Sequence, residues 1–350
     1  MDTIPSLEEL HAFAESLKPH PQGDLIAKTL RQLFAIAAEP GHTRLDWKII
    51  RSTMRDMGTA ISAFAPYQHR RKVAVFGSAR TSASTAIYQE ALRFSERIQE
   101  LGFMVLTGAG GGVMEAGNRG AGKANSFGLN IDLPFEQDAN PYIDRNGKLI
   151  DFRYFFTRKL FFIRESDGFA IFPGGMGTQD ECFELLTLLQ TGRTSPMPLV
   201  LVDPPGSNYW KNWDAYMRDQ LLGNRLISPD DLELYWYTDD VEAAAKYIQH
   251  FYHIYHSSRY VDDLLILRLQ VTLSDPYVAF LNIKFADILV SGEIQKSAFL
   301  PEEDLDETAQ LPRLTLKFNR SSHGRLRQLI DAINDYLPEA TRAGVAEEQV

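Results

Sequence analysis

The spacing of hydrophobic and polar positions changes twice along this chain of 350 residues. In the first part, residues 1–70, apolar side chains recur at intervals of three and four, which is the helical period. Proline and glycine separate the apolar groups, and the longest group predicts a helix from Leu45 to about Phe64 that stops before Pro66. We therefore expect an N-terminal helical extension, in which no motif indicates chemistry.

The second part, residues 71–258, alternates short uncharged apolar runs with helical stretches. The apolar runs predict buried strands at 73–76, 103–107, 169–172 and 199–202, and the stretches between them predict helices at 84–101, 209–222 and 241–256. This alternation is typical of a parallel sheet wrapped by helices, so we predict an α/β fold with a Rossmann-like, doubly wound sheet. Ligands of such sheets collect at the carboxyl ends of the strands, where the turns at Ser78, Gly110 and Gly174 are expected.

The third part, residues 259–350, has yet another pattern. Alternation predicts strands at 265–273, 278–285 and 314–318, and a helical stretch follows at 325–337. An acidic loop at 302–307 lies between the second and third of these strands. We predict a small α+β domain whose role no motif indicates.

The candidate chemistry is concentrated in residues 169–181, FAIFPGGMGTQDE. A strand that runs through glycines into a helix presents free backbone N–H groups beside the positive end of the helix dipole, and such a place binds phosphate. Glycine lets the ligand approach the backbone. The predicted phosphate-binding residues are Gly174, Gly175, Met176, Gly177 and Thr178, with Thr178 expected at the N-cap of the helix. A turn chosen only for tight packing is the alternative.

Carboxylates follow the glycine turn. Thr178 and Glu181 are three residues apart, so they share one helix face with about 5.4 Å between them, comparable to the reach from a ribose 5′-phosphate to its C1′ carbon. A phosphate at the turn would therefore place a glycosidic carbon near Glu181, which we expect to be ionised because the helix N-terminus lowers its pKa. Asp180 points about 100° away from Glu181, so the two carboxylates do not form a facing pair.

Arg158 and Lys159 open the helix predicted before this stretch. Because a cation pair at a helix start opposes the dipole, it needs an anionic partner. That partner is either a ligand or a carboxylate such as Asp151 or Asp167.

Other motifs are weaker. The run 108–113 begins like a dinucleotide fingerprint but has Val113 in place of the third glycine, and the run 117–124 resembles a P-loop but ends in Ala124, which lacks the hydroxyl for Mg²⁺. Neither an NAD site nor ATP hydrolysis is supported.

His250, His253 and His256 share a predicted helix face, but without a carboxylate at matching spacing we expect no metal site. The aromatic cluster Phe155, Phe156, Phe161 and Phe162 is predicted to belong to the core.

Composition narrows the class of partner. The formal net charge of −10 argues against a nucleic-acid backbone or an anionic membrane as the main partner. The single cysteine, Cys182, excludes an internal disulfide and is expected in the core. We find neither a signal-peptide pattern nor an apolar run of membrane-spanning length, so we expect a soluble cytoplasmic protein.

Three motifs together resemble one family. Residues 173–181, PGGMGTQDE, match the PGGxGTxxE signature of the LOG family, phosphoribohydrolases often mislabelled as lysine decarboxylases. Arg158-Lys159 matches its Arg-Lys pair, and residues 107–116 resemble its other glycine-rich loop. The resemblance covers about residues 72–255 and leaves both flanking parts unexplained.

The resemblance implies an enzyme that hydrolyses the N-glycosidic bond of a nucleoside 5′-monophosphate to free base and ribose 5-phosphate. It implies catalytic roles for Arg158 and Glu181 and substrate contacts from Gly110, Gly111, Glu136 and Lys159, with no metal and no cofactor. From their positions beside the glycine turn we also expect Ser78 and Asp180 to contact the substrate. Family members form dimers with shared sites, so at least a homodimer is expected.

The base stays open at this point. Compact members of the family act on cytokinin nucleotides, whereas longer bacterial ones act more generally on purine and pyrimidine monophosphates, and the extensions of this chain favour the general role. The alternative is a non-catalytic protein of the same fold that senses a nucleotide or carries a phosphorylated cofactor. Lysine decarboxylation is disfavoured, because no pyridoxal phosphate site surrounds a candidate lysine.

Overall fold

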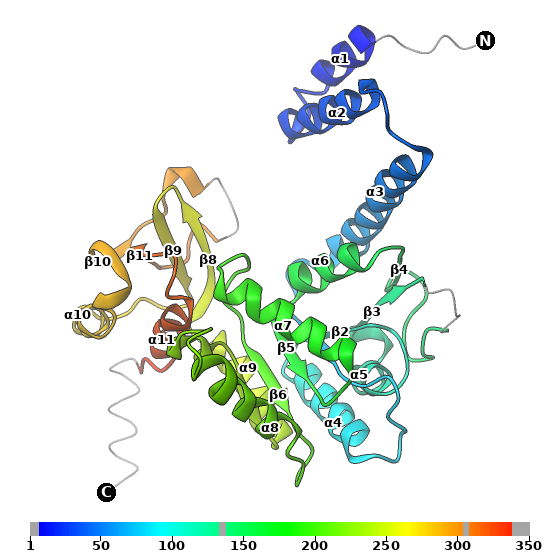
Figure 1. Cartoon of the computed structure of the whole chain (residues 1–350). Coiled ribbons are helices and arrows are strands. Elements are labelled where there is room, and N and C mark those ends of the chain that lie inside the picture. Colours follow the sequence, from blue (N-terminus) through cyan, green and yellow to red (C-terminus); the bar gives the residue numbers. More distant parts are fainter. Residues whose placement is uncertain (1–6, 133–137, 304–307, 338–350) are drawn as a thin grey trace, which may run out of the picture. The chain divides into compact units, whose positions relative to one another are not determined.

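A computed structural model describes residues 7–132, 138–303 and 308–337 (Figure 1). Its internal contacts divide the chain into two units, Met1–Met57 and Gly58–Val350. The first unit contains α1 (Leu7–Ser16), α2 (Gly23–Ala38) and the beginning of α3 (Arg44–Phe64). Ala14 of α1 and Ala27 of α2 are fully buried, and Arg31 pairs with Glu15 between these two helices. The helices predicted in this part are thus confirmed.

The second unit contains a seven-stranded parallel sheet. Its strands lie in the order β4-β3-β2-β1-β5-β6-β7, so the chain moves outward from β1 in one direction and then starts again on its other side with β5. This is the predicted doubly wound, Rossmann-like α/β sheet. The strands are β1 (Lys72–Phe76), β2 (Met104–Thr107), β3 (Ser126–Ile131), β4 (Leu149–Phe152), β5 (Gly168–Ile171), β6 (Leu199–Val202) and β7 (Trp236–Thr238).

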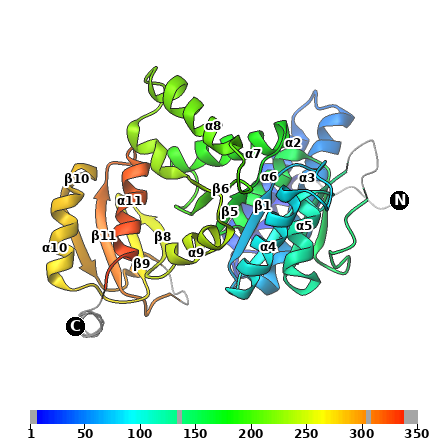
Figure 2. The same ribbon diagram turned by 90° about the horizontal axis from the view of Figure 1, so that it is seen from below.

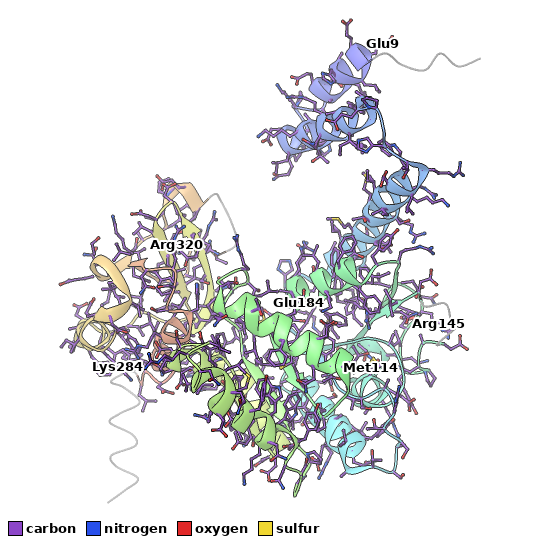
Figure 3. The ribbon with its side chains drawn as sticks, viewed as in Figure 1. Glu9, Met114, Arg145, Glu184, Lys284 and Arg320 are labelled. Carbon is purple, nitrogen blue, oxygen red and sulfur yellow. The ribbon has the colours of Figure 1, made fainter. Side chains whose placement is uncertain are left out.

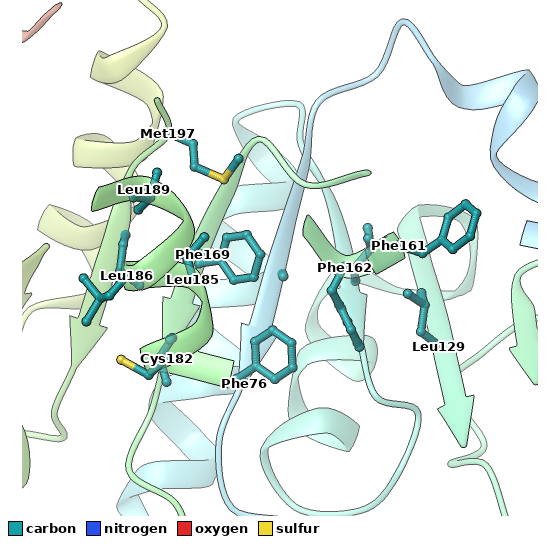
Figure 4. Close-up of a cluster of buried hydrophobic side chains, with 14 of the residues drawn as sticks. Phe76, Leu129, Phe161, Phe162, Phe169, Cys182, Leu185, Leu186, Leu189 and Met197 are labelled. Carbon is teal, nitrogen blue, oxygen red and sulfur yellow. The ribbon is translucent and has the colours of Figure 1, made fainter. Parts of the chain in front are cut away.

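Helices cover both faces of this sheet, because alternate residues of each buried strand point to opposite sides. Ala74 and Phe76 of β1 join one core, which contains side chains of α6 (Phe155–Glu165) and α7 (Met176–Gln190); part of this core is shown in Figure 4. Val73 and Val75 join the other core, which contains side chains of α4 (Ala86–Glu100), α5 (Val113–Ala121) and α9 (Val241–Phe251). Cys182 is buried in the first core, as predicted.

Two helices differ from their predicted bounds. The stretch predicted as one helix from Tyr209 to Leu222 is α8 (Tyr209–Tyr216) followed by a π-helical segment, Met217–Leu222. The helix predicted to reach His256 is α9, which ends at Phe251, so His253 and His256 do not share its face with His250. No group of three side chains that could hold a metal occurs in the described ranges. Nor does any helix among the described residues have the length and apolarity needed to cross a bilayer.

A second, antiparallel sheet follows in the order β10-β11-β9-β8 and lies beside α9 and α11 (Figure 2). Its elements are β8 (Tyr255–Val261), β9 (Leu264–Leu269), α10 (Asp275–Lys284), β10 (Leu289–Ser297), β11 (Arg313–Phe318) and α11 (His323–Asn334). The α+β character predicted here is present. The division into 1–70, 71–258 and 259–350 stays a prediction.

The strand predicted at 278–285 is wrong, because this stretch belongs to helix α10. Ser274 occupies the N-cap and a proline lies in the first turn, which are ordinary helix-start signals. Val278 and Leu281, three residues apart, are buried, whereas Ile283 is 83% exposed. The helical period therefore decides which apolar residues enter the core.

Candidate active site

Three loops meet at the carboxyl ends of β1, β2 and β5, where the winding of the sheet reverses. The N–H of Ser78 donates to the carbonyl of Pro173 (3.1 Å), and the carbonyl of Ser78 accepts from the N–H of Val113 (3.0 Å). The glycine turn after β5 is thereby joined through Ser78 to the start of α5. Ligands of doubly wound sheets bind in the crevice at such a reversal. Of the predicted residues, Ser78, Gly174 and Thr178 come together here.

The helices that begin at this point have no side-chain cap. Gly112 precedes α5 and Gly175 precedes α7, and neither can accept a hydrogen bond through a side chain. By contrast, Thr85 caps α4 and Asp240 caps α9 through their side-chain oxygens. The first N–H groups of a helix have no carbonyl partner within it, so the starts of α5 and α7 can receive an anion.

Thr178 is not the N-cap that the sequence predicts. Helix α7 begins at Met176, so Thr178 is its third residue and its N–H donates to the carbonyl of Gly175 (3.1 Å). Its hydroxyl lies against Gly174, since a Cβ placed on Gly174 would be 2.1 Å from the Thr178 Oγ1 atom. Thr178 still lies in the first turn, beside the uncapped N–H groups.

The glycines of the turn serve two purposes. A Cβ on Gly174 would also come within 2.9 Å of the Ser78 nitrogen, so Gly174 is required by the packing of the loops. A Cβ on Gly175 or Gly177 would meet nothing within 4 Å. These two glycines, with Met176 between them at 92% exposure, border open space, as a surface that a ligand approaches should.

Arg158 reaches the same edge of the sheet from α6. Its Nε donates to the carbonyl of Leu129 at 2.7 Å and its guanidinium approaches the carbonyl of Gly108 at 3.4 Å. Burial lowers the pKa of Arg158, and the nearby charge of Glu181 opposes this shift. Asp151 and Asp167 are not its partners, because Asp151 accepts from Asn130 and Asp167 pairs with Arg71.

Lys159 contacts a group of carboxylates on α7. Its Nζ lies 2.7 Å from Asp180, 2.5 Å from Glu184 and 3.9 Å from Glu181, and Figure 3 labels Glu184 on this helix. Burial lowers the pKa of Lys159, but the hydrogen bonds to Asp180 and Glu184 outweigh it, so the net shift is upward. Lys159 is thus a cation fixed beside Glu181.

Glu181 differs from expectation in its ionisation. Its side chain is buried, and this burial raises its pKa from 4.5 to about 7, although Lys159 and Arg158 act to lower it. The prediction of a lowered pKa for Glu181 is therefore wrong, because the cost of burying the charge exceeds the gain from Lys159 and Arg158. A carboxyl that titrates near neutral pH can accept or donate a proton under ordinary conditions.

The remaining predicted residues are placed as follows. Gly110 is buried and its carbonyl accepts from the Asn140 side chain, while Gly111 is half-buried next to the carbonyl of Ala79. Glu136 lies outside the described residues.

The prediction that the phenylalanines of α6 are all core is half wrong: Phe161 and Phe162 are buried, whereas Phe155 and Phe156 are 53% and 56% exposed.

Two residues that sequence reasoning missed hold the loops in place. The Tyr209 hydroxyl donates to the carbonyl of Gly174 (2.6 Å) and accepts from the amide of Gln179 (2.7 Å). The amide of Asn140 donates to the carbonyls of Ala109 and Gly110 (3.0 Å each). Both residues lie about 30 positions from the loops they bind, and no local pattern marks them.

Taken as chemistry, the arrangement offers an anion site with two uncapped helix starts, two fixed cations, and a buried carboxyl that titrates near neutrality. It can hold a phosphate at the glycine turn and present a proton acceptor one helical turn away. Nothing in this chemistry requires a metal or redox group.

Comparison with known proteins supports a specific family. Residues 111–248 match the family model described as "Possible lysine decarboxylase". A cytokinin riboside 5′-monophosphate phosphoribohydrolase of Mycobacterium tuberculosis is 34% identical over 91 residues, which are 25% of this chain and 46% of the relative. The alignment thus spans about half the length of that curated relative.

Solved structures align with about half of this chain at low sequence identity. The molybdenum cofactor binding protein of Rippkaea orientalis aligns with a TM-score of 0.36 and 21% identity over 51% of this chain and 94% of that one. The Moco carrier protein of Chlamydomonas reinhardtii aligns with a TM-score of 0.35 and 20% identity, with the same coverage.

Proposed function

We propose that this chain, which resembles the LOG family and whose residues 111–248 match the family model described as "Possible lysine decarboxylase", hydrolyses the N-glycosidic bond of a nucleoside 5′-monophosphate. The products are the free base and ribose 5-phosphate. The observation that carries the proposal is Glu181, a buried carboxyl with a pKa of about 7 in the first turns of a helix that opens on uncapped N–H groups.

The phosphate of the substrate binds at the start of α7. The N–H groups of Met176 and Gly177 and the hydroxyl of Thr178 supply donors, and the open space beside Gly175 and Gly177 admits the phosphate oxygens. The ribose then extends along the helix for about one turn, which brings C1′ to the level of Glu181. Ser78 and the glycine-rich loop at Gly110 and Gly111 border the same crevice.

Glu181 acts on the water that attacks C1′. The C1′–N bond breaks with its electron pair leaving on the base, the ribosyl group takes on positive charge, and ionised Glu181 stabilises that charge and accepts a proton from the water. The departing base takes up the proton that the water gave to Glu181, directly or through solvent, and this returns Glu181 to its ionised form. Arg158 assists as a fixed positive charge near the phosphate or the base.

Lys159 and Asp180 have a supporting role in this proposal. Lys159 is held in place by Asp180 and Glu184. Its positive charge acts to lower the pKa of Glu181, so a fraction of the Glu181 carboxyl groups is ionised at neutral pH despite the burial. Asp180 is paired with Lys159 in the described structure, and contact with ribose hydroxyls requires it to exchange that partner. A role for Glu136 in substrate binding stays a prediction.

We further propose, from the family resemblance, that the protein works as a homodimer or larger homo-oligomer and without a cofactor. The extensions on both sides of the matched region favour a general purine or pyrimidine monophosphate as substrate over a cytokinin nucleotide. Lysine decarboxylation is not proposed, because the lysine of the candidate site, Lys159, is engaged by carboxylates.

The test is release of free base. Purified wild type and Glu181→Gln are incubated with AMP, GMP, CMP, UMP and isopentenyl-AMP, and free base is followed by chromatography. Glu96→Gln, which changes an exposed glutamate of α4, is the matched control. We expect base from the wild type and the control and a loss of at least about a hundred-fold in Glu181→Gln.

Calorimetric binding of AMP to the same proteins separates the two candidate functions. If the wild type binds AMP but releases no base from any of the five nucleotides, the hydrolase is refuted and the non-catalytic binding protein takes its place.

A further inference from the structure

A cavity of about 950 Å³ lies at the opposite edge of the parallel sheet from the glycine turn. Its lining includes Arg71, Asp167 and Met197, which lie just before β1, β5 and β6. Residues of β8 in the second sheet also line it. Candidate-site residues such as Ser78 and Gly174 follow β1 and β5 instead. Since β1 has five residues, about 16 Å of strand separates the two edges. We call this space the basal cavity.

The basal cavity is rich in positive charge. Arg70, Arg71, Arg164 and Arg193 line it, against one lining carboxylate, Asp167, and Arg164 is paired with Glu165 next to the lining. The C-terminal ends of α6 and α7 lie on this side and contribute roughly half a negative charge each. Even with both helix ends subtracted, the described lining keeps an excess of positive charge, in a chain whose formal net charge is −10.

Two of these arginines have no carboxylate partner among the described residues. Arg193 is exposed and makes no ion pair or side-chain hydrogen bond there, and Arg70 donates to the amide oxygen of Asn125 (3.1 Å). Arg71 is held in place by Asp167 (2.9 Å) and by stacking on the ring of Tyr252 (3.6 Å to its centroid). One arginine is thus fixed, and two others are able to turn toward a ligand.

Ser166 also belongs to the lining, but its Oγ atom is itself buried and is not presented to a ligand in the cavity. Further polar groups in the lining come from Thr194, Ser258 and Gln270.

We propose that the basal cavity is a second binding site, and that it takes a small polyanion with at least two phosphate or carboxylate groups. Its volume is in the range of small-molecule sites. Arginines bind phosphate and carboxylate oxygens in a bidentate manner, and two or more anionic groups match the number of arginines better than one does. This site is independent of the proposed hydrolysis.

The test uses the full-length protein and two probes, pyrophosphate and citrate, in titration calorimetry at constant ionic strength. Saturating ribose 5-phosphate is present throughout, so that the phosphate site at the glycine turn does not contribute. The variant is Arg70→Ala/Arg193→Ala. The matched control is Arg145→Ala/Arg225→Ala, which removes two exposed arginines that do not line the cavity; Arg145 is labelled in Figure 3.

We expect at least one probe to bind the wild type and the control with equal affinity. Its affinity for the variant should fall by up to about ten-fold for each arginine removed. Preference for pyrophosphate or for citrate then identifies phosphate or carboxylate as the favoured group. Equal unfolding temperatures without ligand show that all three proteins are folded, and the single variants replace the double one if it is not. Failure of both probes to bind, or equal binding to variant and control, overturns the proposal.

Because the readout is binding rather than base release, this result does not depend on whether the protein hydrolyses nucleotides. A protein that binds pyrophosphate through Arg70 and Arg193 but releases no base would keep the basal site and lose the proposed function. A protein that releases base but does not bind pyrophosphate through these arginines would keep the proposed function and lose the basal site.

Discussion

Replacement of Glu181 by glutamine should stabilise this protein at neutral and alkaline pH. Burial raises the pKa of Glu181 from 4.5 to about 7, so the folded protein holds a proton there over a range in which the unfolded chain has released it. Wherever the folded state binds more protons than the unfolded state, stability falls as the pH rises. The wild type therefore loses stability as the pH rises through this window, whereas glutamine remains neutral.

The magnitude follows from the size of the shift. The pKa of Glu181 differs by about 2.5 between its ordinary value of 4.5 and its value of about 7 in the folded protein. This difference corresponds to about 3 kcal/mol. Glu181→Gln should thus raise the free energy of unfolding by about 3 kcal/mol near pH 8 and by less than about 1 kcal/mol near pH 5. For a unit of nearly 300 residues this means about 5 °C in unfolding temperature near pH 8.

Thermal unfolding of wild type, Glu181→Gln and the exposed control Glu96→Gln across this pH range measures the effect. The control should track the wild type at every pH. If Glu181→Gln were no more stable than the wild type near pH 8, or if its advantage did not shrink on acidification, the carboxylate would not carry the cost of burial, and the reasoning that assigns it a neutral pKa would be refuted.

Three further outcomes follow from the site. The kcat for AMP should rise with pH to a plateau with a midpoint at about 7 or slightly above, because Glu181 must be ionised and bound phosphate raises its pKa further; a rate that is constant between about pH 5 and pH 8 would contradict this role. Gly174→Ala should lower the free energy of unfolding by about 1–3 kcal/mol, because its Cβ overlaps Thr178. Gly177→Ala should instead fold normally yet raise the KM for AMP. Equal losses of stability in the two variants, measured by calorimetry, would refute this distinction. Tyr209→Phe removes the hydroxyl that binds the Gly174 carbonyl and should cost about 1 kcal/mol in denaturant unfolding together with weaker AMP binding; unchanged binding would show that the turn holds its shape without Tyr209.

The sheet and the glycine turn are readable from the sequence because their signals are local. The uncharged run at Val73–Phe76 lies in the buried strand β1, and the run at Phe169–Phe172 lies in β5 except for its last residue; the glycines between β5 and α7 mark the change from strand to helix. Helix α10 is harder to read from the sequence, because apolar residues on both its buried and exposed faces obscure the helical period and only the start signal at Ser274 and Asp275 indicates a helix.

The ionisation of Glu181 and the basal cavity are not readable in the same way. A helix N-terminus is visible in the sequence and lowers a carboxyl pKa, but the burial that reverses this shift depends on neighbours that fold around Glu181 from α6 and the sheet. Arg70, Arg164 and Arg193 lie in separate segments and meet only in three dimensions. Local patterns therefore predict which residues begin a site, and the fold decides their charge state and their neighbours.

The most direct measurement is simultaneous quantification of both products from AMP. The wild type should release adenine and ribose 5-phosphate in equal amounts, and Glu181→Gln, which should still bind AMP but lacks the ionisable carboxylate, should release neither. Release of adenosine and inorganic phosphate would show that a different bond is cleaved, and equal release of adenine by wild type and Glu181→Gln would show that Glu181 does not carry the reaction.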